Sequence, residues 1–156
     1  MPDDDVGVVE LDFTPSVVRI RVSSPFHGDP PPPGPPGPTE ALWNYEVVEV
    51  FLVGSRDYLE VELSPHGHYL VLQLSGPRVV ERRLIPVAYE VSSRNTVGWK
   101  GMAALPVDLI PEGLDRYNAY RIYGIGSDRR YLARFPVPGE GPDFHRLECF
   151  GRLESE

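Results

Sequence analysis

Two imidazoles lie two residues apart in the segment His66-Gly67-His68. In an extended chain alternate side chains point to the same side, so both rings would face one way, a spacing that metal sites and proton relays use. Ser64, Pro65 and Gly67 are also typical of a hairpin turn, where polar side chains stand in water. We favour the turn, and His66 and His68 remain candidate ligand-binding residues.

An aromatic group with polar neighbours precedes the most apolar segment of the chain. Trp43 and Tyr45 flank the amide of Asn44, and Glu46 follows. Flat rings can stack on the apolar face of a sugar, while an amide and a carboxylate offer partners for its hydroxyls. These four residues are therefore candidate saccharide-binding residues. The alternative, which average burial favours, is that both rings fill the end of a core.

Carboxylates recur on two expected strands, at Glu49, Glu60 and Glu62. Glu60 and Glu62 share one face of a strand, and Glu49 joins them if the two strands pair. Several oxygens at close range suit calcium, although we expect no cofactor. Buried carboxylates need partners, and we favour an ion-pair network with nearby arginines: Arg19, Arg21 or Arg121.

One pair of residues near the end of the chain suggests a catalytic arrangement. Asp143 and His145 look like an acid that orients an imidazole, with Phe144 between them. The chain has no Gly-x-Ser-x-Gly motif to supply a nucleophile, and its single cysteine, Cys149, lies among apolar residues. We expect no enzyme, with Phe144 filling the core and His145 bonded to the backbone.

Residues 29–38 form a proline-rich segment with two glycines. Proline removes the donors that a sheet needs, so the segment predicts a loop rather than a strand. Overlapping PxxP registers dock on aromatic grooves of partner proteins, but the nearest flanking charges, Asp29 and Glu40, are acidic. A stiff solvated loop is the interpretation we favour.

Strand patterns dominate the rest of the chain. Residues 58–63 and 68–74 alternate around a turn and predict a hairpin, next to a central strand at 47–53. Leu59, Val61 and Leu63 are expected on one buried face with Leu70 and Leu72. Further strands are expected at 6–13, 16–23, 79–84, 86–92, 97–105, 116–125, 129–135 and 147–153, with one helical turn near 107–110. The predicted fold is an all-β, two-sheet antiparallel β-sandwich.

Composition limits the classes of partner. The chain has 156 residues and a net charge of −8, which repels nucleic acid and anionic membranes. Its length predicts one domain over residues 1–156. With one cysteine and no apolar leader or membrane-length segment, a cytoplasmic location is expected.

Two segments, 42–52 and 58–67, resemble an uncharacterised protein family best known from animals. Residues 24–31 and the segment Pro142-Asp143-Phe144-His145 fit the same pattern, so the resemblance covers roughly residues 16–150. Asn44 stands where those sequences tend to have aspartate, and Ser64 stands where they tend to have cysteine. At these two positions the chain therefore lacks the acidic ligand and the thiol that the similar sequences would offer.

That family is in turn similar to the DOMON-like fold of family 9 carbohydrate-binding modules, a β-sandwich. Trp43 before an acid-bearing strand, then Gly98-Trp99 and Leu105-Pro106, follow its order. The resemblance implies non-catalytic saccharide binding, in some members with structural calcium. Our interpretation is a binding module for a saccharide or polyol. A protein-interaction domain using the proline-rich loop or a sheet edge, and an unrecognised enzyme, remain alternatives.

Overall fold

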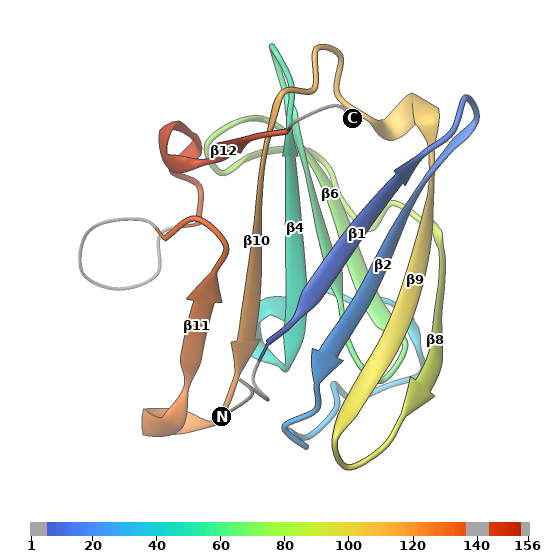
Figure 1. Ribbon diagram of the computed structural model, residues 1–156, viewed down its shortest axis with the longest axis vertical. Coiled ribbons are helices and arrows are strands. Elements are labelled where there is room, and N and C mark those ends of the chain that lie inside the picture. The colour runs from blue at the N-terminus through green and yellow to red at the C-terminus, as the bar shows by residue number, and fades with distance from the viewer. Residues whose placement is uncertain (1–5, 137–143, 154–156) are drawn as a thin grey trace.

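Alternating and β-branched segments form the strands of two β-sheets that pack face to face (Figure 1). The computed structural model describes residues 6–136 and 144–153. Its strands there are β1 (Val8–Phe13), β2 (Val17–Pro25), β3 (Gly37–Pro38), β4 (Val47–Val53), β5 (Tyr58–Leu63), β6 (His68–Gly76), β7 (Val79–Arg82), β8 (Ala88–Arg94), β9 (Gly98–Pro106), β10 (Arg116–Tyr123), β11 (Arg130–Ala133) and β12 (Gly151–Arg152). Its helices are single 3-10 turns: η1 (Leu42–Asn44), η2 (Val107–Leu109), η3 (Gly126–Asp128) and η4 (Leu147–Cys149). No helix in this part of the chain is long and apolar enough to span a membrane.

The smaller sheet has the order β1-β2-β9-β8, and the larger one the order β11-β10-β4-β5-β6-β3. In the larger sheet β12 also pairs with β10, and β7 with β6. β4, β5 and β6 are adjacent as predicted, with Val61 opposite both Val50 and Val71. The helical turn predicted near 107–110 is η2. The all-β sandwich is therefore confirmed.

One ladder departs from the prediction of antiparallel sheets. β3 pairs with the start of β6 in parallel, Gly37 opposite His68 and Pro38 opposite Tyr69. The expectation of a loop without strand at 29–38 is therefore wrong for these two residues. These two residues form an edge strand of the sheet. Proline, which has no N–H to donate, is tolerated in an edge strand because only one side of it pairs with a neighbour.

The central strands of the larger sheet, β4, β5 and most of β6, are buried on both faces. The inner face of this sheet meets the smaller sheet in one core cluster, which includes Leu59, Val61, Leu63, Tyr69 and Val71, together with these smaller-sheet residues: Ile20, Val22, Trp99, Ala103 and Leu105. Its outer face carries a second cluster, covered in part by η1 and the segment around η4 and including Phe51, Tyr58, Tyr120, Ile122 and Phe150. Carboxylates that alternate onto the outer face are thus enclosed as well.

The prediction that Leu70 and Leu72 share a face with Leu59, Val61 and Leu63 is wrong. Because Val61 pairs with Val71, the two leucines point outward into the second cluster. Every residue from 68 to 72 is buried, so β6 has no polar face to set its register. A strand buried on both sides reads as a continuous apolar run, in which the inward set cannot be told from the outward set.

Candidate functional site

A cavity of about 660 Å³ opens on the outer face of the larger sheet, beside η1. Three aromatic side chains line it, Trp43, Tyr131 and Phe144. Its polar lining consists of Asn44, Glu49, Glu60, Arg78, Arg129 and His145. The volume falls within the range of small-molecule sites, and the lining combines apolar faces with charged hydrogen-bonding groups.

Trp43 stands at this cavity with its ring 44% exposed, so the interpretation that it fills the end of the core is wrong. Its backbone is held by Arg129, whose guanidinium donates to the Trp43 carbonyl at 2.6 Å and to the Tyr45 carbonyl at 3.1 Å. The same side chain donates to the Gly124 carbonyl at 3.0 Å. Arg129 therefore links η1 to the connection between β10 and β11. These bonds hold the backbone on both sides of Asn44 and so fix the position of Trp43.

The other two members of the predicted aromatic group do not line the cavity. Tyr45 is half-buried and packs on the outer core cluster, as the burial alternative expects. The Glu46 carboxylate accepts from the backbone N–H groups of His27 and Asp29, at 2.8 and 3.2 Å. Burial raises the pKa of Glu46, while these bonds act in the opposite direction. Glu46 thus anchors the start of the proline-rich loop.

His66 and His68 do not line the cavity, and each ring makes contacts elsewhere through one of its nitrogens. His68 is buried, so the expectation of two rings exposed at a hairpin tip is wrong for it, and its Nε2 lies 3.1 Å from the Gly34 carbonyl. Arg94 lies 3.0 Å from Nδ1 of His66, and the Phe26 ring meets the His66 ring edge-on at 5.7 Å. Burial, then the Arg94 charge, lowers the pKa of His66. The pair supports the loop packing around β6.

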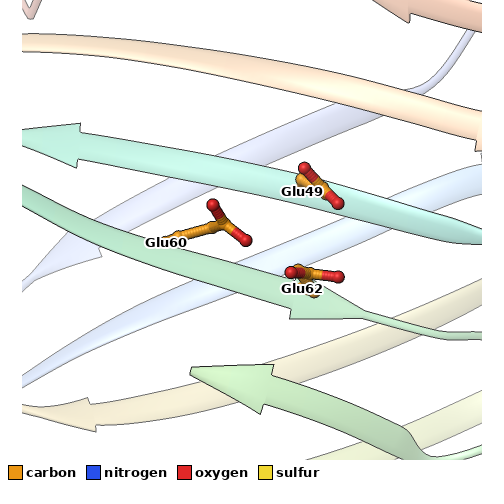
Figure 2. A group of neighbouring side chains, drawn as sticks. All are labelled: Glu49, Glu60 and Glu62. Carbon is orange, nitrogen blue, oxygen red and sulfur yellow. The ribbon is translucent and has the colours of Figure 1, made fainter. Parts of the chain in front are cut away.

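Glu49, Glu60 and Glu62 meet on the outer face as the sequence suggested (Figure 2). Burial, then the Glu60 charge, raises the pKa of Glu49, while its hydrogen bond with Glu62 acts in the opposite direction. Burial, then the Glu49 charge, raises the pKa of Glu62. The predicted arginine network is wrong for the described residues: the ion partner of the trio there is His145, with Nε2 3.5 Å from Glu60 Oε1. The Arg129 charge lowers the pKa of Glu49 only in part.

His145 joins this group through side chains. Its Nδ1 lies 2.6 Å from the Tyr58 hydroxyl, which also accepts from the Arg78 backbone N–H at 3.1 Å. Phe144 stacks on Tyr120 with ring centroids 4.0 Å apart. Asp143, the expected partner of His145, lies outside the described residues.

Among the lining residues that could bind a ligand through charge or an aromatic ring, sequence reasoning missed Arg78, Arg129 and Tyr131. Arg129 and Tyr131 follow the turn at η3, and the register of β11 on β10 brings them to the outer face. The tight turn was visible in Gly126-Ser127-Asp128. The direction in which the next side chains point was not, because it depends on that register.

A second cavity, of about 300 Å³, opens between the sheets near β1 and β10. Its lining is mostly apolar, with Arg121 and Arg134 as the charged side chains. Within the described residues no carboxylate or imidazole lines it. The outer cavity therefore offers the richer chemistry for recognising a polar ligand.

Relatives of this chain are found in animals. A rat protein named UPF0462 protein C4orf33 homolog is 46% identical over 143 residues, which cover 85% of this chain and 71% of the relative. The chain belongs to the UPF0462 family. The human member of the family is 44% identical over 85% of this chain and 71% of the human protein. The zebrafish homolog is 41% identical over 91% of this chain and 78% of the zebrafish protein. The resemblance noted in the sequence is thereby confirmed, although no protein-family model matches the chain.

One solved structure shows the same fold as this UPF0462 chain. It is a Bacteroides uniformis protein described as a "putative carbohydrate-binding protein", with a TM-score of 0.73. The match covers 94% of this chain and 77% of the bacterial one, at 18% sequence identity. At that identity the likeness shows the β-sandwich fold and not a ligand.

Proposed function

We propose that this UPF0462 protein is a non-catalytic binding module whose outer-face cavity takes a saccharide or polyol. The observation that carries the proposal is an exposed indole at a cavity lined by charged hydrogen-bonding groups. Sugars have this dual character, with an apolar C–H face and a rim of hydroxyls. The bacterial protein of the same fold carries a carbohydrate-binding description, which agrees with this choice.

The aromatic part of the cavity matches the C–H face. Trp43 and Tyr131 are each 44% exposed, and both line the cavity. The Arg129 guanidinium lies 5.8 Å from the centre of the Tyr131 ring and donates to the Trp43 carbonyl. One side chain therefore contacts both aromatic residues, which together form an aromatic platform. A platform held in place before binding loses little conformational freedom on binding, which favours affinity.

The polar part of the cavity matches the hydroxyls. Glu60 and His145 are linked to each other across 3.5 Å, and Asn44 adds an exposed amide near the indole. Carboxylates accept from hydroxyls, while amides and imidazoles can donate or accept. A ligand with several neighbouring hydroxyls can therefore be met by donors and acceptors at once.

A glycan array followed by calorimetry tests the proposal. We expect at least one oligosaccharide to bind with a Kd in the millimolar range or tighter, about −4 kcal/mol or better. Trp43→Ala should remove this binding, while Phe13→Ala, which changes an equally exposed ring on β1, should leave it unchanged. Absence of any binding saccharide, or equal loss in both variants, would contradict the proposal. Hydrolysis of the bound sugar would overturn its non-catalytic part.

A further inference from the structure

Three carboxylates converge on the outer face because of strand register and alternation. Glu49 on β4 lies directly opposite Glu62 on β5, and Glu60 lies two residues before Glu62 on the same face. One oxygen from each lies within 4.8 Å of the others (Figure 2). Their exposed fractions are 2%, 4% and 0% for Glu49, Glu60 and Glu62. The cluster thus gathers three acidic groups away from solvent.

Glu62 gives independent evidence that a ligand belongs here. Both of its carboxyl oxygens are buried, and apart from the carboxyl groups of Glu49 and Glu60 they have no hydrogen-bonding partner among the described residues. These two neighbours are acidic as well, so they bring no positive charge to Glu62. A buried ionised carboxylate without a partner is strongly unfavourable, so proteins protonate such groups or bind a cation with them.

Within residues 6–136 and 144–153, the ion pair that reaches this trio of acidic groups is the one between His145 and Glu60. Arg129 pairs with Asp29 at 4.0 Å, and its charge acts on Glu49 from a greater distance. The Tyr58 hydroxyl and the Glu60 carboxylate lie at the two ring nitrogens of His145 and so fix its orientation. An oriented neighbour of this kind commonly supports a metal-bound carboxylate.

We propose that Glu49, Glu60 and Glu62 bind a divalent metal ion at the floor of the cavity that Trp43 borders. Oxygens on opposite sides of a calcium ion, each about 2.3–2.6 Å from it, are about 5 Å apart, which the 4.8 Å spread of the three oxygens allows. An all-carboxylate set suits Ca²⁺, Mg²⁺ or Mn²⁺ rather than a soft metal. Glu49 and Glu60 also line the cavity, so the ion would be reached from the same opening.

Manganese titration of the metal-free protein tests this site without any saccharide. We expect one Mn²⁺ to bind, measured by the loss of the free-ion electron paramagnetic resonance signal, and Ca²⁺ to compete for it. Glu62→Gln should weaken Mn²⁺ binding at least tenfold. Glu90→Gln, the same change at an exposed glutamate on β8, should leave it unchanged.

Circular dichroism and thermal unfolding show that both variants are folded before they are compared. Trp43→Ala should keep full Mn²⁺ affinity, so a failure of saccharide binding and a failure of the metal site give different results. The proposal is overturned if the folded protein binds none of Mn²⁺, Ca²⁺ or Mg²⁺. It is equally overturned if Glu62→Gln binds Mn²⁺ as tightly as the Glu90→Gln control, because the trio would then be neutralised by protons.

Discussion

The two faces of the larger sheet are built from the same strands but are organised differently. On β5, Leu59, Val61 and Leu63 face inward, and each is completely buried against the smaller sheet. Tyr58, Glu60 and Glu62 alternate with them and face outward. At these positions the inner face therefore stabilises the fold through apolar contacts. The outer face is just as buried at these positions, yet it carries two carboxyl groups on a single strand.

This difference separates stability from function along one strand. Burial of an apolar side chain such as Val61 contributes roughly 1.5–3 kcal/mol, whereas burial of a carboxylate works against folding unless it is compensated. The outer face also has short coverings, η1 and the segment around η4, in place of a second sheet, and the cavity lies beside them. We infer that the outer face contributes less to stability than the inner face because its buried carboxyl groups and its cavity serve binding.

The largest expected effect comes from a charge placed on the inner face. Val61→Asp buries an unpartnered carboxylate at a site that is 0% exposed, and should cost several kcal/mol, about enough to unfold a marginal domain. Val97→Asp makes the same change at a side chain that is 79% exposed, and should change stability by less than about 0.5 kcal/mol. Urea unfolding compares the two. An unchanged midpoint for Val61→Asp would contradict the assignment of the inner face.

A smaller loss is expected for the arginine that holds the cavity rim. Arg129→Gln removes the bonds to the Trp43 and Tyr45 carbonyls and leaves the buried Asp29 without its 4.0 Å ion pair. The free energy of unfolding should fall by about 2 kcal/mol, and saccharide affinity should fall with it. Arg130→Gln is the matched control, since Arg130 is exposed and lies outside the cavity lining. Equal effects of the two changes would refute the role of Arg129.

The outer carboxylates should make stability depend on pH. Because the pKa values of Glu49 and Glu62 are raised by folding, the native state holds protons that the unfolded chain releases. The free energy of unfolding of the metal-free protein should therefore fall as the pH rises from the ordinary glutamate pKa through the raised values. Glu62→Gln should flatten this slope, and Glu90→Gln should not. Urea titrations between pH 5 and 8 in a chelator measure it, and identical slopes would refute the claim.

The smallest effect on stability is expected at the rim. Trp43→Ala removes an exposed ring that contributes to neither core cluster, so the thermal midpoint should move little, within about 0.5 kcal/mol of stability. Saccharide binding should nevertheless disappear. A loss of several kcal/mol would show instead that Trp43 is a structural residue.

The position of most strands could be predicted from local sequence patterns. Which face of the sheet each side chain occupies could be predicted less well. The alternation in 58–63 placed Leu59, Val61 and Leu63 together and Glu60 with Glu62, and the structure agrees. Residues 68–72 are apolar at nearly every position, so the orientation of Leu70 and Leu72 depended on a pairing that the sequence does not reveal.

The candidate site divides in the same way. Trp43 and Asn44 could be proposed from residue type, and both line the cavity. Arg129 and His145, which come from distant parts of the chain, meet them only through the fold, and Tyr45, Glu46, His66 and His68 prove to have structural contacts of their own. Local sequence identifies side chains that could bind, whereas tertiary pairing decides which of them share a cavity.

The most direct test of the account is the fluorescence of Trp43. Trp99 is 2% exposed and should contribute a constant blue emission, while the 44% exposed Trp43 should emit to the red and be quenched by iodide. Trp43→Phe supplies the Trp99 spectrum for subtraction. The account predicts that a binding saccharide shifts the Trp43 emission and protects it from iodide. A Trp43 that iodide cannot reach, or an emission that no saccharide changes at millimolar concentration, would contradict it.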